Sequence, residues 1–470
     1  MAIRLYSYGA AEEVTGSRHI LDTGTSRIMV DCGAFQGRRQ EADEKNRTWD
    51  GTESSVSATV LTHAHFDHCG LLPLLCKKGY KGNIYSTAAT RDLANLILMD
   101  SAKIQDRDAE YLRKQAARKG EKFTWEPLYR EADVIAAMEQ FVTVSYKRPI
   151  FVSRDAEVTF YDAGHILGSS LARFSVTREG GGTIDIGFSG DLGRKNKPII
   201  RDPSLIPPVD YLVLESTYGD RLHEPADDIL NRLAQIAGHA VKHGGKLIIP
   251  AFAVERTQDL VFYLHLLSDQ KRIQNVPIFV DSPMAVSATA IFKLHPECYD
   301  EETRNAFTKH HANPFGFNNL TFIENVEASK KLNDLTGPAI IISSSGMCEA
   351  GRILHHLAHT IADPKNIVLI VGFMAKDTLG RKIRDRERQI KILGETYIRR
   401  AEVEEIGALS SHADYNEIWE YVSGLDLKRL KKIFLVHGEH EAQAHLQEFL
   451  LGKGVQAVDI VKRGETYELN

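Results

Sequence analysis

The sequence predicts an α/β protein in which one domain is interrupted by another, and three observations lead to this prediction. Short apolar runs separated by glycine and polar turns dominate residues 1–215, as in a strand-rich domain. Helical and strand patterns alternate through residues 216–395, which favours a mostly parallel sheet with helices on its faces. The strand-rich pattern returns in residues 396–470, so this segment is expected to complete the first domain.

The length supports two domains, because 470 residues exceed what one hydrophobic core usually holds. The expected strands of the first segment are apolar runs at residues 28–30, 59–62, 158–161, 184–188 and 211–214. Between these runs, residues 101–119 and 131–140 have helical composition.

The same patterns assign the elements of the other two segments. In the insert we expect a helix up to His243, a strand at 246–250, a helix at 255–267, and strands at 277–280, 339–343 and 366–371. After the insert we expect a helix at 414–422 and strands at 432–436 and 458–461.

Composition limits the partners only in part. The formal net charge is −5, whereas nucleic-acid-binding domains are usually basic, but attraction of phosphate depends on the local field. No apolar stretch approaches the roughly 20 residues that span a bilayer, and the N-terminus lacks a signal-peptide pattern, so no membrane partner is expected. The five cysteines form no CxxC pair and are expected to be reduced thiols of a cytoplasmic protein.

A dense cluster of metal-ligand residues follows the apolar run at residues 58–61. His63, His65, Asp67 and His68 fall where a strand gives way to a turn, so their side chains can converge. Imidazoles combined with a carboxylate are a ligand set typical of zinc. One histidine is commonplace and a pair is often a surface accident, but this cluster favours a metal site.

Three more strand ends offer ligands to complete such a site. His165, Asp191 and His437 each follow an expected strand and have glycine nearby, which suits a sharp turn that presents one side chain. Each is weak evidence alone, and His165 by itself would more simply be a core histidine. Together the seven residues suit a pair of metal ions that share one carboxylate.

These residues resemble the motifs of a known family. The cluster at 63–68, with Asp31, His165 and Asp191, resembles the successive motifs of the metallo-β-lactamase superfamily. Glu215, His412 and His437, in their sequence contexts, resemble three further motifs of the β-CASP RNA-processing nucleases, which include the cleavage and polyadenylation endonuclease subunit and RNase J. The stretches 250–256, 281–285 and 343–352 support the resemblance, which covers nearly the whole chain. It implies a metallo-β-lactamase αββα sandwich interrupted by a β-CASP α/β domain.

The resemblance also implies a role for each ligand. It assigns one zinc ion to His63, His65 and His165, a second to Asp67, His68 and His437, and a bridge between the ions to Asp191. It also implies that Asp31 orients a ligand histidine from behind. The alternative for Asp31 is a turn aspartate that accepts hydrogen bonds from backbone amides.

By the same resemblance, the expected reaction is hydrolysis of a phosphodiester by a zinc pair and three catalytic residues. Two zinc ions lower the pKa of a shared water and neutralise charge on the phosphate. Asp67 would orient that water, and His412, paired with Glu215, would protonate the leaving oxygen. The alternative for residues 411–414 is a helix start capped by Asp414, and both interpretations can hold together.

A phosphate site is expected in the insert. Ser344, Ser345 and Gly346 follow the strand at 339–343, and free amides and hydroxyls there would suit a phosphate. Arg352 is expected to contact the same phosphate, and Lys376 is a second, weaker candidate. The alternative is that these small residues only fill a loop.

The family resemblance favours a ribonuclease that acts on single-stranded RNA. A small-molecule hydrolase of the same fold would have no reason to carry the insert, Glu215 or His412. A DNA nuclease is less favoured because DNA-directed members tend to have an apolar residue where His437 stands. A non-enzymatic member would have lost ligands, and all are present here.

The mode of cleavage and the assembly stay open. We expect an endonuclease, with a 5′–3′ exoribonuclease as the alternative, because RNase J-type members carry a further C-terminal domain. A homodimer is a possible assembly.

Overall fold

The computed structural model describes residues 2–49, 55–223, 228–273, 275–309, 313, 315–372, 374 and 377–470. Lys376, one of the candidate phosphate-binding residues, lies outside these ranges. The chain divides into two compact units. Unit 1 contains residues 1–197, 201–222 and 412–470, and unit 2 contains residues 198–200 and 223–411.

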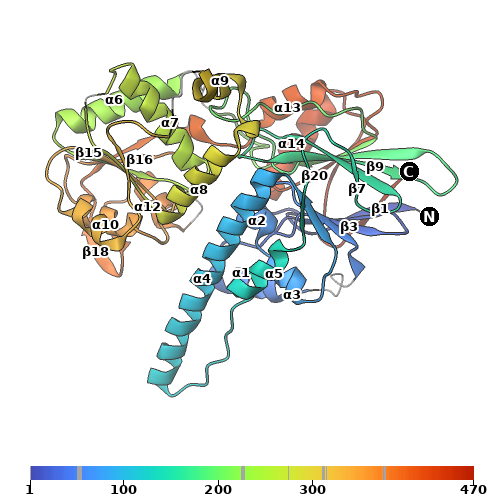
Figure 1. The fold of residues 1–470 in the computed structure, drawn as a ribbon, viewed down its shortest axis with the longest axis horizontal. Helices are drawn as coiled ribbons and strands as arrows, with labels where there is room; N and C mark the ends of the chain where they lie inside the picture. Colours follow the sequence, from blue (N-terminus) through green and yellow to red (C-terminus); the bar gives the residue numbers. More distant parts are fainter. Residues whose placement is uncertain are drawn as a thin grey trace. The chain divides into compact units, whose positions relative to one another are not determined.

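Unit 1 contains two sheets (Figure 1). The first sheet has the strand order β22-β1-β2-β3-β4-β5-β6 and the second has the order β21-β20-β11-β10-β9-β8-β7. The strands of the first sheet are β1 (Ile3–Gly9), β2 (Arg18–Asp22), β3 (Arg27–Val30), β4 (Ala58–Val60), β5 (Asn83–Ser86), β6 (Phe141–Thr143) and β22 (Thr466–Leu469). Those of the second are β7 (Ile150–Phe151), β8 (Ala156–Asp162), β9 (Ser170–Thr177), β10 (Thr183–Phe188), β11 (Tyr211–Glu215), β20 (Lys432–Val436) and β21 (Val458–Ile460).

The two sheets of unit 1 pack face to face. Leu5 and Val30 of the first sheet share a buried core with Phe160, Phe174 and Phe434 of the second. Strand β1 shows why, since its buried positions alternate with exposed or half-buried ones, as expected for a strand with one covered face. The last strand, β22, pairs with β1, so the C-terminal segment completes the first sheet.

Helices cover the outer faces of both sheets. The helices of the N-terminal part are α1 (Arg39–Arg47), α2 (Phe66–Cys69), α3 (Leu72–Lys77), α4 (Ala88–Lys119) and α5 (Glu131–Met138). On the second sheet, α13 (Tyr415–Ser423) and α14 (His440–Gly452) pack through Ile418, Val422 and Leu446 against Leu212 and Leu435. This helix–sheet–sheet–helix arrangement confirms the αββα sandwich expected from the sequence.

Unit 2 is built around a six-stranded parallel sheet of order β14-β13-β15-β12-β16-β19. Its strands are β12 (Lys246–Pro250), β13 (Ile278–Asp281), β14 (Leu320–Phe322), β15 (Ala339–Ser343), β16 (Ile367–Ile370) and β19 (Glu402–Glu405), beside the hairpin of β17 (Gln389–Ile392) and β18 (Glu395–Ile398). Its α-helices are α6 (Ile229–Lys242), α7 (Arg256–Asp269), α8 (Pro283–Leu294), α9 (Glu301–Lys309), α10 (Val326–Asn333), α11 (Ile353–Thr360) and α12 (Leu379–Arg384). Strands β12, β15 and β16 are buried along their whole length, as expected for central strands of a parallel sheet.

The chain returns to unit 1 later than the sequence patterns suggested. We expected the first domain to resume at residue 396, but the unit boundary lies between Ser411 and His412. Strand β19 explains the difference, because it pairs with β16 and so belongs to the sheet of unit 2. Among the described residues, no helix is both long enough and apolar enough to cross a membrane.

Candidate metal centre

The expected metal ligands of unit 1 all lie just after strand ends. Asp31 follows β3, the cluster at 63–68 follows β4, and His165 follows β8. Asp191 follows β10 and His437 follows β20. Because β10, β11 and β20 are parallel neighbours, their carboxyl ends meet at one edge of the second sheet.

Four of these side chains form a first group. His63, His65, His165 and Asp191 each offer a ligand atom within 4.8 Å of the others. Nδ1 of His65 lies 3.2 Å from Nε2 of His63 and 3.1 Å from Nε2 of His165. Both of these Nε2 atoms lie 3.4 Å from Oδ2 of Asp191. The three histidines expected to hold one ion therefore lie together with Asp191, as expected.

Three side chains form a second group beside the first. Asp67, His68 and His437 converge within the same limit, with 3.1 Å between the Nε2 atoms of His68 and His437 and 3.5 Å between His437 Nε2 and Asp67 Oδ2. Oδ1 of Asp191 lies 3.1 Å from Nε2 of His68. Asp191 thus presents one carboxylate oxygen to each group, which is the placement that a bridging ligand requires.

The spacing and chemistry of these atoms fit a pair of divalent cations. Tetrahedral zinc with bonds of about 2.1 Å to nitrogen and oxygen separates its ligand atoms by about 3.4 Å, close to the distances in both groups. Oδ1 of Asp191 is buried and accepts no hydrogen bond from the described residues, although a buried carboxylate oxygen normally has a partner. Burial lowers the pKa of His65 to about 3 and also lowers the pKa values of His63 and His165, which favours the neutral form that binds metal, whereas at His68 the carboxylates of Asp191 and Asp31 outweigh burial and raise the pKa.

Asp31 holds histidines of both groups from behind. Its Oδ2 lies 2.7 Å from Nδ1 of His68 and accepts a hydrogen bond of 2.9 Å from the hydroxyl of Thr62. Its Oδ1 accepts one of 2.8 Å from the Thr62 amide. Since the Thr62 hydroxyl donates to Asp31, it accepts from Nδ1 of His63, 3.1 Å away. One carboxylate therefore directs Nε2 of both His63 and His68 toward the metal positions.

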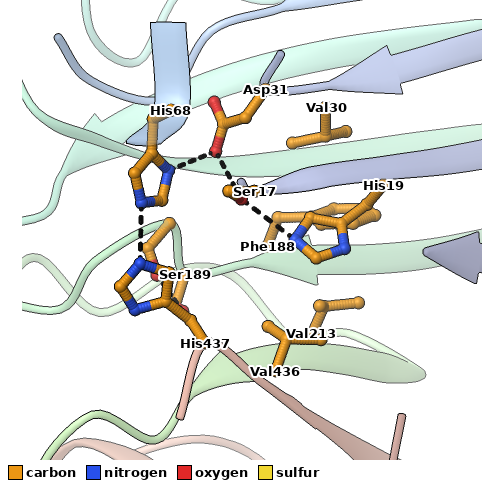
Figure 2. A pocket seen from close by; sticks show the side chains of 11 residues that line it. Ser17, His19, Val30, Asp31, His68, Phe188, Ser189, Val213, Val436 and His437 are labelled. Atoms are coloured by element: carbon orange, nitrogen blue, oxygen red, sulfur yellow. Dashed lines mark hydrogen bonds and ion pairs between the residues drawn. The ribbon is translucent and has the colours of Figure 1, made fainter. Parts of the chain in front are cut away.

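A chain of hydroxyl and imidazole groups extends this network into the core (Figure 2). Ser17 donates to Oδ2 of Asp31 over 3.4 Å, and Nε2 of His19 lies 3.1 Å from the Ser17 hydroxyl. Nδ1 of His19 lies 2.7 Å from the hydroxyl of Ser7. Burial lowers the pKa of His19 to about 4, so it is neutral and can donate at one nitrogen and accept at the other. The proton of each hydrogen bond in this network can then point toward Asp31.

His437 is held in a similar way by a residue in the turn that follows β11. The Thr217 hydroxyl lies 3.0 Å from Nδ1 of His437 and donates a hydrogen bond of 3.1 Å to the backbone carbonyl of the same residue. Its lone pairs are therefore free to accept from Nδ1, which again leaves Nε2 for a metal. His437 and Asp31 both have positive φ values, 55° and 60°, a strained conformation that is frequent at functional sites.

Glycine at position 33 allows the ligand cluster to lie against the end of β3. The amide of Cys32 donates to the carbonyl of His68 over 2.8 Å, and the amide of Ala34 donates to that of Phe66 over 3.1 Å. A Cβ atom on Gly33 would lie 1.6 Å from the backbone oxygen of Asp67. Any side chain at this position would therefore push the ligand cluster away from Asp31.

The expected catalytic pair lies beside the first group. Nδ1 of His412 lies 3.0 and 3.1 Å from the two carboxylate oxygens of Glu215, and its Nε2 lies 3.8 Å from Oδ2 of Asp191. Glu215 is fully buried and also accepts from the amide of Leu192 over 2.7 Å. Burial opposes the charged form of His412, but Glu215 and Asp191 outweigh it and raise the pKa of His412 to about 9. A protonated imidazole therefore faces the metal positions at neutral pH. Asp414 caps α13 as well, so both interpretations of this segment hold.

The phosphate candidates lie in unit 2, where Arg352 has internal partners. Its guanidinium donates to Oδ1 of the buried Asp281 over 2.7 Å and to the carbonyls of Ile323 and Glu324. Ser344 donates to the hydroxyl of Ser282 over 3.1 Å. Ser345 accepts from the amides of Glu349 and Ala350, and Gly346 lies against the ring of Phe252. The structure thus gives Arg352 a role in packing that the sequence did not indicate.

The residues that hold the expected ligands in place could not be recognised from the sequence. Thr62, Thr217 and Ser17 form hydrogen bonds to expected ligands or to Asp31, and His19 contacts Ser17, but serine, threonine and histidine occur throughout the chain. The adjacency of Thr62 to His63 was the one available signal.

Three family models match successive parts of the chain. A model described as the metallo-beta-lactamase superfamily matches residues 19–235, and a Beta-Casp domain model matches residues 257–383. A model described as a Zn-dependent metallo-hydrolase RNA specificity domain matches residues 396–458. These ranges follow the order of the segments expected from the sequence.

Characterised relatives are similar over nearly the whole chain. Ribonuclease TTHA0252 of Thermus thermophilus is 36% identical over 463 residues, which cover 98% of this chain and 99% of that protein. The protein named transcription termination factor FttA is 30% identical in Methanosarcina mazei, over 94% of this chain and 67% of that protein. Its counterpart in Pyrococcus horikoshii is 31% identical, over 93% of this chain and 66% of that protein.

A solved structure shares the fold without a close sequence. A protein of unknown function from Enterococcus faecalis is 12% identical with a TM-score of 0.55, and the similarity covers all of both chains.

Proposed function

Because the chain belongs to the β-CASP family of the metallo-β-lactamase superfamily and is a metal-dependent hydrolase, we propose that it is a ribonuclease that uses two zinc ions to cut single-stranded RNA internally. The pairing of His412 with Glu215 beside Asp191 carries this proposal. A metal site alone would serve many hydrolases, but a protonated imidazole facing it supplies the acid that a poor leaving group such as a ribose oxygen needs.

The residues that would hold the ions are those of the two groups. His63, His65 and His165 would hold one ion, Asp67, His68 and His437 the other, and Asp191 would contact both. When bound, a zinc pair lowers the pKa of water and neutralises negative charge on the phosphate.

The protein side chains then perform the remaining tasks. Asp67, at the edge of the second group, can accept a hydrogen bond from the attacking water and orient it toward phosphorus. As the bond between phosphorus and the leaving oxygen breaks, Nε2 of His412 gives its proton to that oxygen. Glu215 keeps Nδ1 of His412 protonated and the ring oriented throughout.

The relatives point to RNA as the polymer. Ribonuclease TTHA0252 is named for that activity and is similar to this chain from end to end. The model for an RNA specificity domain covers the segment that contributes His412 and His437. Internal cleavage is the preferred mode, with 5′–3′ exonuclease action as the alternative. The homodimer and the cytoplasmic location stay predictions.

Metal content and product analysis test this proposal together. Plasma mass spectrometry should find about two zinc ions per chain. A 5′-labelled single-stranded RNA should give internal fragments that disappear with a chelator. Mononucleotides released from the 5′ end would replace the endonuclease by the exonuclease. Two zinc ions without cleavage of RNA would overturn the ribonuclease, and absence of metal would overturn the zinc site.

A further inference from the structure

Helix α4 of unit 1 is much longer than its packing requires. It spans Ala88–Lys119, 32 residues, yet its last buried residue is Ala109. At 1.5 Å per residue the helix is about 48 Å long, of which roughly the last 15 Å lacks core contacts. Figure 1 shows α4 extending past α1, α3 and α5 of the same unit. Packing therefore does not explain the final ten residues.

The extension is a built structure and not a frayed end. Gly120 ends the helix in a left-handed conformation, and the chain then returns along it. The Leu128 amide donates to Oε1 of Gln105 over 2.8 Å, and the guanidinium of Arg113 lies 5.4 Å from the ring of Phe123. A return segment held at several points keeps the helix in a defined conformation.

The exposed face of this helix is basic. Lys103, Arg107, Tyr111, Lys114 and Arg118 are all exposed and follow one another at intervals of three or four residues, so they share one face, here called the basic stripe. Lys114 forms an ion pair with Glu110, and Lys103 and Arg107 interact electrostatically with the half-buried Asp100, whereas Arg118 has no acidic partner among the described residues. Residues 103–122 contain seven lysines and arginines against four acidic residues, in a chain whose net charge is −5. Positive charge is thus concentrated in this segment, although the chain as a whole carries a net negative charge.

The start of α4 fixes the basic stripe relative to the metal centre. The hydroxyls of Thr87 and Thr90 donate to the carbonyl of Gly168 over 2.7 and 2.8 Å, and this loop carries His165. Along the helix, the basic stripe runs from roughly 22 Å to roughly 45 Å beyond this anchor. A polymer that contacts the basic stripe would therefore have to be long to reach the metal centre at the same time.

We propose that the basic stripe binds the phosphate backbone of single-stranded RNA at a distance from the cleavage site. This proposal rests on the proposed ribonuclease function and adds a second contact for the same substrate. Four cations on one helix face suit a polyanion, which would compete with Glu110 for Lys114, and Tyr111, 60% exposed, offers a ring on which a base can stack. RNA long enough to reach both places would gain affinity, whereas a short RNA at the metal centre would not.

The test compares two variants that lose the same charge. R107Q/K114Q/R118Q removes three cations of the basic stripe, and glutamine preserves helix propensity. The control R148Q/R154Q/R178Q removes three exposed arginines of unit 1 that lie outside α4. Circular dichroism and the melting temperature establish that both variants fold. Each is assayed as the zinc-loaded full chain.

The assays separate binding from cleavage. For an RNA of about 30 nucleotides, the stripe variant should raise KM about tenfold or more, with kcat unchanged. For an RNA of about six nucleotides, KM should not change. In fluorescence anisotropy with a hydrolysis-resistant phosphorothioate RNA, the slope of log Kd against log salt should fall by about 2, since each phosphate contact on a single strand contributes about 0.7.

Either assay can overturn the proposal. Unchanged binding of long RNA by the stripe variant, or an equal loss in the control, would show that the basic stripe is only a solvated surface. If the wild-type chain binds long RNA through the stripe but cuts neither RNA, the proposed function fails while the RNA contact stands.

Discussion

Oδ2 of Asp31 accepts a hydrogen bond from Nδ1 of His68 over 2.7 Å, and both side chains are buried. The same oxygen accepts from Thr62, which in turn contacts His63. A single anion thus orients one histidine in each of the two metal groups, although neither group contains it.

Replacing Asp31 with alanine should therefore weaken binding of both metal ions and not of one. Loss of such a partner typically costs 10- to 100-fold in metal affinity. Competition with a chromogenic chelator, followed to the second equivalent, measures both affinities. If only the ion expected at His68 is lost, the hydrogen bonds from Asp31 through Thr62 do not affect metal binding at His63.

Thr217→Val should weaken binding of the metal ion that His437 is expected to hold. Valine has nearly the shape of threonine but cannot accept from Nδ1 of His437, so the imidazole loses the partner that sets its tautomer. The expected loss in affinity for one of the two ions is about tenfold. Thr217→Ser restores the hydroxyl and is the matched control. Equal metal affinity in valine and serine variants would contradict this role.

His412→Ala should keep the metal ions and lose turnover. His412 shares a group with Asp191 and Glu215 but is not one of the expected metal ligands, so metal content should match the wild type, while kcat for RNA should fall about 10²- to 10⁴-fold without the acid. Single-turnover cleavage under saturating enzyme isolates this step. Wild-type rates in the variant would exclude His412 as the acid.

The pH profile tests the pairing of His412 with Glu215. Burial opposes protonation, but the carboxylates of Glu215 and Asp191 raise the pKa of His412 from 6.5 to about 9. Because the acid must be protonated, kcat should be retained below this value and fall as the pH rises through about 9. Glu215→Gln removes the nearer charge, so the decline should begin at lower pH. The same alkaline limb in both proteins would contradict the pairing.

Arg352→Ala should destabilise unit 2. The guanidinium pairs with a fully buried carboxylate, Asp281, and removal of one member of a buried pair costs about 3 kcal/mol. The exposed pair of Arg381 and Asp385 is the control, and Arg381→Ala should cost less than about 1 kcal/mol. Urea unfolding of both variants measures the difference. A change in KM for RNA with no change in stability would instead support the phosphate contact expected from the sequence.

The side chains that converge in the two groups could be singled out from the sequence because they follow strand ends in recognisable patterns. The order of strand-rich and alternating segments likewise predicted the αββα sandwich and its insert, which the structure confirms. In contrast, the partner of Arg352 lies 71 residues away in the sequence, at Asp281, and no local pattern indicates that contact. Helix α4 was expected only from residue 101, because its first turns are mixed in polarity and lie against the core.

Strand β19 shows a second reason why the sequence did not predict the whole fold. Three of its four residues are glutamates and only Val403 is apolar, so the segment carries little strand signal of its own, and pairing with β16 decides its conformation. The return to unit 1 was therefore placed too early in the sequence.

The metal centre joins residues that are synthesised far apart in time. His68 and His437 contact each other across 369 positions, and the whole of unit 2 is encoded between them. On the ribosome, the N-terminal ligands emerge long before the last one, so a nascent or prematurely terminated chain lacks a ligand of the second group. The second group of expected ligands is therefore complete only when synthesis of the chain is nearly finished.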